Sequence, residues 1–345
     1  MKRPLLYNMS MLELTLENTA AYLRSQGWID AEPVHVEMLA GGVSNQVLRV
    51  TTPASRIVLK QSRPQLRTRD TWFSDLDRIW REQEVMQALY PHLPDVVPKV
   101  LHVDRPNYVY TMSHAPLDAR VWKAELLAGT IDVQLARRVG EVLGRIHQIS
   151  AGFRQFADHT AYVQLRVDPF YRRVQERCPD VADAIAPIVA DMLTRKEALC
   201  HGDYTPKNIL VHDAGFMLVD YETAHFGDPS MDLGLFLAHL TLKAVRDQPR
   251  TAQYLELMRA FWSGYRAVIG LPDIERRGVQ HLGACLLARV DGTSPVDYLG
   301  DEQKAIVRKL GHAILLGGMS RWEEVWQWLL QSSDGSCSGL NSTRS

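Results

Sequence analysis

Residues able to act in catalysis or metal binding gather in two short stretches of the chain, HGDYTPKN and LVDYE. The first contains Asp203 and Asn208, and the second contains Asp220, twelve residues beyond Asn208. Two apolar runs, NILVH and FMLVD, link the stretches and are separated by turn residues 213–215. This pattern predicts a β-hairpin that brings Asn208 and Asp220 together at its open end. We therefore expect two carboxylates and one amide to face a common space.

The chemistry of these side chains suits a magnesium-bound phosphate. Mg²⁺ keeps several waters and takes one or two carboxylates together with the phosphates of a substrate. Asp203 would then be placed to accept a proton from a hydroxyl nucleophile. A metal-dependent hydrolase that uses His201, Asp203 and Asp220 is a competing interpretation, but no HxH motif or second histidine cluster supports it. A surface loop with scattered polar residues is the other alternative.

The elements that must position these side chains follow two patterns. Residues 1–112 read as a helix, three strands, a helix and two strands, and long helical patterns dominate afterwards. We expect an α+β fold with a small β-rich lobe (1–112), a helical lobe (113–330) and a disordered tail (331–345). Predicted helices cover residues 10–27, 75–90, 131–148, 180–196, 230–246, 251–268, 274–290, 302–317 and 321–331. Predicted strands cover residues 34–40, 46–51, 56–60, 96–104 and 107–112.

The polar stretches resemble those of eukaryotic-type kinases and, more closely, of the aminoglycoside phosphotransferase and choline kinase superfamily. Its pattern is H-G-D-x-x-x-x-N followed by a D-x-E-like motif. The resemblance implies a protein-kinase-like two-lobed fold, with Asp203 positioning or deprotonating an acceptor hydroxyl and Mg²⁺ held by Asn208 and Asp220. GDPSMDL also matches the family's G-D-P-x-x-D-L. There the later Asp, here Asp232, would hydrogen-bond the catalytic-loop backbone, and His201 would support the loop.

A glycine-containing turn lies between two predicted strands and could approach the phosphates of a nucleotide. Gly41 and Gly42 permit close backbone approach, and Ser44 and Asn45 add polar side chains. A Gly-Gly turn is also common in ordinary hairpins. The stretch lacks the protein-kinase G-x-G-x-x-G pattern and resembles the shorter G-G-x-S-N version of the superfamily.

Lys60 closes a predicted strand and could reach the α- and β-phosphates if a carboxylate oriented it. Glu82 lies on the next predicted helix at the family's E-x-x-x-L-x-x-L spacing, and Glu84 is the competing partner on another face. A lysine on a solvated strand edge is the plainer alternative. By resemblance, the backbone around Met112 would hydrogen-bond adenine, although Met112 could equally be a core residue.

The region between Lys60 and Glu82 is similar to that of methylthioribose kinases. The matching positions are Lys60, Gln61, Pro64, Arg67, Trp72, Asp77, Arg78 and Glu82. The catalytic stretch departs from that subfamily, because Lys207-Asn208 stands where small residues and Ser are usual and DYE replaces D-P-E. The identity of the acceptor therefore stays open.

The helical lobe should hold the acceptor pocket. Arg289 and Asp291 sit at a polar break within apolar sequence, so they could face the substrate or form an interhelix salt bridge. Glu222 could support a metal or cap a turn.

Composition narrows the functional classes. The 345 residues include 39 Lys and Arg against 40 Asp and Glu, a formal charge of −1 that argues against a dedicated nucleic-acid binder. Four cysteines without a CxxC pair argue against a zinc site or disulfide framework and favour a reducing, cytoplasmic compartment. No apolar run of about 18 residues or clear signal peptide is evident, so we expect no membrane segment.

The function that these features predict is transfer of the γ-phosphoryl group of ATP, bound between the lobes with Mg²⁺, to a hydroxyl of a sugar, amino sugar or amino alcohol. A catalytically silent kinase-fold nucleotide-binding or regulatory protein is the alternative. A protein kinase is disfavoured because G-x-G-x-x-G and an A-P-E-like segment are absent from the sequence. The sequence does not separate ATP from GTP or indicate an oligomeric state.

Overall fold

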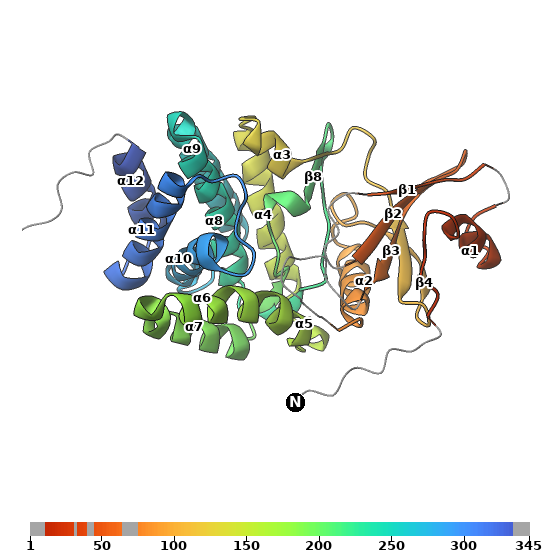
Figure 1. Cartoon of the computed structure of the whole chain (residues 1–345), viewed down its shortest axis with the longest axis horizontal. Helices are drawn as coiled ribbons and strands as arrows, with labels where there is room; N and C mark the ends of the chain where they lie inside the picture. Colours follow the sequence, from red (N-terminus) through yellow and green to blue (C-terminus); the bar gives the residue numbers. More distant parts are fainter. Residues whose placement is uncertain (1–10, 31–32, 40–44, 64–74, 334–345) are drawn as a thin grey trace, which may run out of the picture. The chain divides into compact units, whose positions relative to one another are not determined.

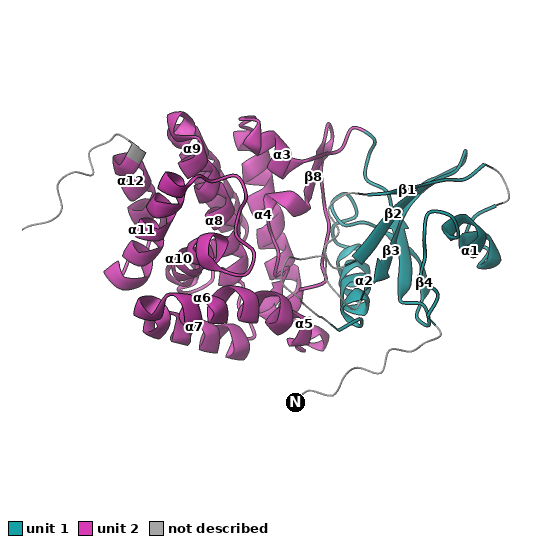
Figure 2. Cartoon of the chain, in the orientation of Figure 1, with its two compact units in different colours: residues 1–117 teal, residues 118–345 magenta. Residues whose placement is uncertain are grey.

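The computed structural model describes residues 11–30, 33–39, 45–63 and 75–333. The chain divides into two compact units, residues 1–117 and 118–345, drawn in teal and magenta in Figure 2. The first unit is built around an antiparallel sheet and the second is mainly helical, which confirms the predicted α+β class. Among the described residues, no helix is both long and apolar enough to cross a membrane.

Five strands form the sheet of the first unit, in the order β1-β2-β3-β5-β4 with antiparallel neighbours (Figure 1). From β1 to β5 they are His35–Met38, Asn45–Thr51, Arg56–Ser62, Val100–Asp104 and Val109–Ser113. Leu48 of β2 pairs with Leu59 of β3, and both are buried in a core that includes Leu23 of α1 (Thr19–Ser25). The helix α2 (Arg78–Leu89) packs against β3 and β4.

The first helix is shorter than predicted, because it begins at Thr19 rather than near residue 10. The backbone before it is bound by side chains of the sheet instead. The amide of Leu14 donates to Gln61, and its carbonyl accepts from Gln46 at 2.6 Å. These side chains satisfy backbone groups that a helix would otherwise have to pair.

The second unit is dominated by helices that pack in pairs, α4 against α9 and α8 against α10. Its helices α3 to α12 are Trp122–Leu127, Val133–Ile149, Thr160–Tyr162, Arg173–Arg177, Ala182–Thr194, Ser230–Arg246, Thr251–Val268, Ile274–Asp291, Asp301–Gly317 and Trp322–Ser333. At the α4–α9 contact, a Cβ on Gly140 would lie 2.0 Å from the carbonyl oxygen of Phe261, so a larger residue cannot fit there.

Two small sheets complete the second unit and carry the polar stretches. The strands β8 (Ile209–His212) and β9 (Gly215–Leu218) form the predicted hairpin, joined by β6 (Arg120–Val121). The other sheet pairs β7 (Ala198–Cys200) with β10 (His225–Gly227). The hairpin prediction is therefore confirmed. The sequence did not reveal the helical segment around the π-helix Val163–Arg172, which contains Pro169.

Candidate active site

The loop that follows β7 is anchored by one buried carboxylate at the start of α8. Asp232 accepts hydrogen bonds from the backbone amides of His201, at 2.7 Å, and Gly202, at 2.8 Å. Gly202 has φ +76°, and a Cβ there would lie 2.5 Å from the carbonyl oxygen of Thr223. Only glycine meets both conditions without strain. The turn that places Asp203 is thus fixed from two sides.

His201 supports this loop from within. Its Nε2 lies 3.2 Å from the carbonyl oxygen of Val219, and its Nδ1 lies 3.2 Å from the backbone nitrogen of Asp203. These contacts fit a neutral ring that donates through Nε2 and accepts through Nδ1. Burial lowers the pKa of His201, although the charges of Asp232, Asp203 and Asp220 oppose this. The neutral imidazole of His201, held by two hydrogen bonds, supports the loop.

Asp203 is held as a carboxylate by neighbouring cations. Its Oδ2 lies 2.7 Å from Arg166 and 2.9 Å from Lys207, and it accepts from the Asn208 amide at 2.9 Å. Burial acts to raise the pKa of Asp203, but the charges of Arg166 and Lys207 outweigh it and hold the pKa well below its usual range. Among the described residues these donors all contact Oδ2, so Oδ1 is left to accept another hydrogen bond.

Asn208 links Asp203 to the hairpin. Its side-chain nitrogen also donates to the backbone oxygen of Asp203 at 2.9 Å, and its own backbone oxygen accepts from Val219 at 3.0 Å. Asp220 follows Val219 directly and adopts φ +75°, an uncommon conformation for a residue other than glycine. Asn208 and Asp220 therefore stand at the same end of the β8–β9 hairpin, as their spacing predicted.

The donor set here fits a magnesium ion. Both amide hydrogens of Asn208 are directed at Asp203, which leaves its Oδ1 as an oxygen ligand at the hairpin end that also carries Asp220. In the described part of the chain, no three or more His, Cys, Asp or Glu side chains group as a metal site. Two protein oxygens suit Mg²⁺, because it fills its remaining positions with water and substrate phosphates.

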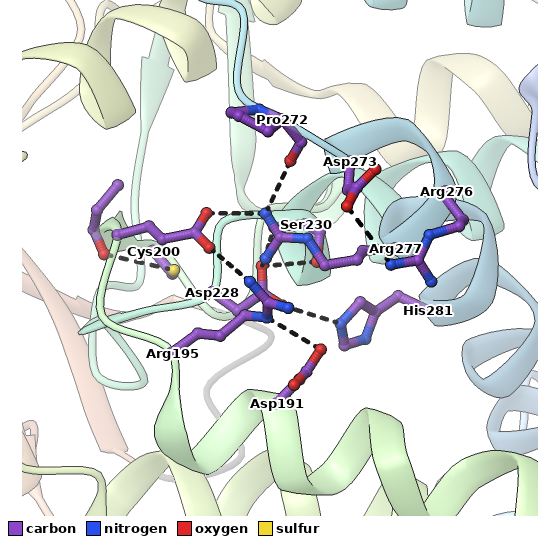
Figure 3. Close-up of polar contacts among 12 residues, drawn as sticks. Asp191, Arg195, Cys200, Asp228, Ser230, Pro272, Asp273, Arg276, Arg277 and His281 are labelled. Carbon is purple, nitrogen blue, oxygen red and sulfur yellow. Dashed lines mark hydrogen bonds and ion pairs between the residues drawn. The ribbon is translucent and has the colours of Figure 1, made fainter.

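A buried ion network stands behind the start of α8 (Figure 3). Asp228 accepts from Arg277 at 2.5 Å and from the hydroxyl of Ser230 at 2.7 Å, and Arg277 also binds Glu197 at 2.8 Å. Burial would raise the pKa of Asp228, but His281 and Arg277 hold it well below its usual range. The network ties α10 to the first turn of α8, which carries Asp232.

In the first unit, Lys60 forms a buried ion pair with Glu82, with a distance of 2.7 Å between Nζ and Oε1. Glu82 is fully buried, whereas Glu84 pairs with Arg105 at 3.0 Å. Of the two partners that the sequence left open for Lys60, the structure has Glu82. The pairing follows from helix phase, since Glu82 lies on the same face of α2 as the buried Met86.

Other predicted nucleotide residues are placed only in part. Asn45 is buried at the start of β2, and Met112 is a buried residue of β5 that pairs with Val58. The remaining predicted positions lie outside the described residues; they are Gly41, Gly42, Ser44, Pro64, Arg67 and Trp72.

The predicted acceptor residues have different surroundings. Arg289, near the end of α10, donates to the carbonyl oxygen of Ser294 at 2.6 Å. Asp291 binds Arg308 of α11 at 2.8 Å, so this carboxylate makes an interhelix salt bridge. Glu222 is buried two residues after Asp220.

Sequence reasoning missed Arg166, which lies 37 positions before Asp203 and belongs to no motif. Lys207 did carry a signal, because it departs from the small residue usual in methylthioribose kinases, but its contact with Asp203 was not foreseen. Lys207 is only four positions from Asp203, whereas Arg166 reaches Asp203 through the packing of a distant segment.

A comparison with protein families now identifies the chain. The model of the phosphotransferase enzyme family matches residues 35–271, which is more than half of the sequence. This chain belongs to the phosphotransferase enzyme family. The matched segment includes the Lys60–Glu82 pair and every polar residue from His201 to Asp232 described above.

An individual enzyme is also similar to this chain in sequence. A methylthioribose kinase of Citrobacter koseri is 29% identical over 262 residues, covering 66% of this chain and 65% of the relative. The match thus spans just under two thirds of that relative's length.

Two solved structures share the kinase-like fold. An amicoumacin kinase has a TM-score of 0.57 at 15% identity, covering 88% of this chain and 95% of that one. A Plasmodium vivax ethanolamine kinase has a TM-score of 0.51 at 12% identity, covering 93% and 88%. The predicted kinase-like α+β fold is confirmed.

Proposed function

We propose that this chain is a small-molecule kinase that transfers the γ-phosphoryl group of ATP to a hydroxyl of a sugar, amino sugar or amino alcohol. The observation that carries the proposal is the arrangement of Asp203 and Asn208. Three donors occupy Oδ2 of Asp203 and leave Oδ1 for an acceptor hydroxyl, while Asn208 and Asp220 lie at the same end of the β8–β9 hairpin. Membership of the phosphotransferase enzyme family supports it.

Asp203 would bind the acceptor hydroxyl through Oδ1 and orient its oxygen for in-line attack on the γ-phosphorus. Its low pKa makes it a weak base, so its main contribution is orientation, with the proton taken up late in the transfer. Asn208 and Asp220 would hold Mg²⁺, which when bound neutralises charge on the phosphates. Lys60, oriented by Glu82, would contact the α- and β-phosphates.

The remaining predicted roles belong to the same proposal. Asn45, with the Gly41, Gly42 and Ser44 turn, would contact phosphate, and the backbone near Met112 would contact adenine. Arg289 would face the acceptor, and Asp291 and Glu222 would shape its surroundings. A cytoplasmic location with no nucleic-acid or membrane partner fits this function.

The test is ATP consumption by the full chain with Mg²⁺ against a panel of sugars, amino sugars, amino alcohols and aminoglycosides, with methylthioribose included. Asp203→Asn should cut kcat by at least a hundredfold and leave the KM for ATP within about threefold. Asp183→Asn, an exposed position of α7, is the matched control. Full turnover by Asp203→Asn would remove Asp203 from the mechanism. Mg²⁺-dependent ATP binding without phosphorylation of any alcohol would favour the catalytically silent alternative.

A further inference from the structure

The second unit holds more positive charge around Asp203 than its carboxylates can balance. We call this group the basic cluster, and its members are Arg166, Lys207, Arg289, Lys123 and Lys243. They come from five separate segments, namely the π-helix before α6, the 3₁₀ turn before β8, and the helices α10, α3 and α8. The fold therefore gathers charges that are far apart in the sequence.

Two aromatic rings organise the basic cluster. The guanidinium groups of Arg166 and Arg289 lie 5.5 and 5.9 Å from the centre of the Phe170 ring. The ammonium groups of Lys123 and Lys243 lie 5.7 and 5.8 Å from the centre of the Tyr298 ring. Cations at this distance from a ring face are attracted by its quadrupole, but they still repel one another.

The two halves of the basic cluster influence each other. Burial, together with the charges of Lys123 and Arg289, lowers the pKa of Lys243 to about 7. Burial also lowers the pKa of Arg289, which senses both Asp203 and Arg166. Arg289 is connected to Asp203 through Arg166, which lies over the same Phe170 ring and pairs with Asp203.

Counter-charges for the basic cluster are scarce. Within the described residues, Lys123, Lys243 and Arg289 form no ion pair. Lys243 is buried and donates only to the carbonyl oxygen of His239 in its own helix, at 2.9 Å. Asp203 is already bound by Arg166 and Lys207, and Asp297, which raises the pKa of Lys123, is an exposed residue.

Hydrogen-bonding capacity is also left unused here. The Nε of Arg289 and the hydroxyl of Tyr298 are buried, and neither has a hydrogen-bond partner in the described part of the chain. A purely structural group of buried cations is expected to be paired, because an isolated buried charge is costly. Unpaired donors and unbalanced cations together are what a site for an anion requires.

We propose that the acceptor alcohol carries an anionic group, a carboxylate or a phosphate, which Arg289, Lys123 and Lys243 bind while its hydroxyl faces Asp203. This inference rests on the proposed kinase function and narrows its acceptor to sugar acids, hydroxy acids or sugar phosphates. A cationic acceptor such as an aminoglycoside would meet like charge and be disfavoured.

The reaction itself remains a phosphoryl transfer. The acceptor oxygen forms a bond to the γ-phosphorus, and the bond from that phosphorus to the β,γ-bridging oxygen breaks, so ADP leaves with the bonding electrons. The hydroxyl proton passes to Asp203 or to water. The basic cluster supplies binding and orientation rather than a new chemical step.

The test compares matched alcohols that differ in charge, using the full chain with MgATP. The pairs are ribose with ribose 5-phosphate, glycerol with glycerate, and galactose with galacturonate, and ethanolamine and kanamycin represent cations. We expect kcat/KM at least tenfold higher for the charged member of one or more pairs, and the pair concerned distinguishes carboxylate from phosphate. Equal or higher values for the neutral or cationic alcohols would overturn the proposal and leave the kinase function intact.

Variants connect any preference to the basic cluster. Lys123→Met and Lys243→Met should each lower the anionic-to-neutral ratio of kcat/KM at least fivefold without raising the KM for ATP. Lys309→Met, an exposed position of α11, should leave the ratio unchanged. An unchanged ratio in both cluster variants would exclude the cluster as the anion site.

Binding provides a readout that does not need turnover. Calorimetric titration of the full chain should show ribose 5-phosphate or glycerate binding at least tenfold more tightly than its uncharged partner, with the difference lost in Lys123→Met. Failure of every anionic probe to bind would overturn the anion site. Binding without phosphorylation of any alcohol would instead contradict the kinase function alone.

Discussion

An oxygen of the Asp232 carboxylate lies 2.7 Å from the backbone nitrogen of His201, and the other oxygen of the same group binds the next amide. One side chain thus holds two successive peptide groups of the loop that carries Asp203. Burial acts to raise the pKa of Asp232, but contacts with His147 and the His201 amide lower it, so it is ionised when it holds the loop.

Asp232→Asn should loosen this loop, because an amide presents one NH₂ group where the carboxylate presents an acceptor. Hydrogen bonds to a charged group contribute about 1.5–3 kcal/mol, so we expect the free energy of unfolding to fall by about 2 kcal/mol. Because Asp232 positions the loop that carries Asp203, Asp232→Asn should lower kcat more than tenfold and change the KM for ATP less than threefold. Asp301→Asn, a fully exposed change, is the control for urea unfolding and kinetics. Equal losses in kcat and ATP affinity would indicate general damage instead.

Gly202→Ala should destabilise the same loop through its backbone. A left-handed conformation costs a residue with a Cβ about 1–2 kcal/mol, and the new methyl would also approach the Thr223 carbonyl at 2.5 Å. We expect a loss of at least about 2 kcal/mol by chemical unfolding. Gly152→Ala is matched to it, because nothing lies within 4 Å of a Cβ there. Similar stability of the two variants would contradict the assigned role of Gly202.

Lys60→Met should be costly because it removes the cation that lies 2.7 Å from the buried carboxylate of Glu82. Breaking a buried pair from one side costs about 3–5 kcal/mol, whereas replacing both partners with apolar residues can be neutral. The double variant Lys60→Met, Glu82→Met should therefore recover most of the stability and none of the affinity for MgATP. Glu84→Ala, whose partner Arg105 is exposed, should cost less than about 1 kcal/mol. If the double variant did not recover stability, Lys60 and Glu82 would have to interact strongly with other residues as well.

Lys243→Met should stabilise the unliganded protein in a pH-dependent way. Burial holds the pKa of Lys243 near 7 in the folded chain, against an ordinary value of 10.5. Below about pH 7 the lysine is charged in both states and the folded state bears the desolvation cost, up to about 5 kcal/mol at 1.4 kcal/mol per pKa unit. Between pH 7 and 10.5 the folded state loses its proton first, so that cost is relieved. Unfolding curves should show the advantage of the methionine variant shrinking over this range; a constant difference would place the pKa elsewhere.

Much of the fold follows from local pattern. The helices Ser230–Arg246 and Thr251–Val268 have the predicted bounds, because each combines a strong apolar periodicity with clear breaks at its ends. The segment around Val163–Arg172 was missed because Pro169 and a π-helical pitch disturb that periodicity. The strands β7 and β10, with three residues each, are too short to show alternation.

The candidate site likewise combines contacts that the local sequence predicts with contacts that it does not. Spacing along one hairpin was enough to place Asn208 and Asp220 at the same end of it, since the strands β8 and β9 have equal lengths and a short turn joins them. Arg166 reaches Asp203, and Lys243 reaches the Tyr298 ring, through packing between distant segments, and no local pattern predicts such contacts. The partner of Lys60, Glu82 or Glu84, depends on how α2 is rotated about its axis against the sheet. The sequence pattern favours one rotation but does not determine it.

The burial of Lys243 has a consequence for the amount of this protein in a cell. An anionic acceptor that binds at Lys243, as proposed above, would stabilise the folded protein, so its binding would shift the folding equilibrium. Quality-control proteases degrade chains in proportion to their unfolded fraction. The abundance of this protein would therefore track the supply of its proposed acceptor without any dedicated regulator.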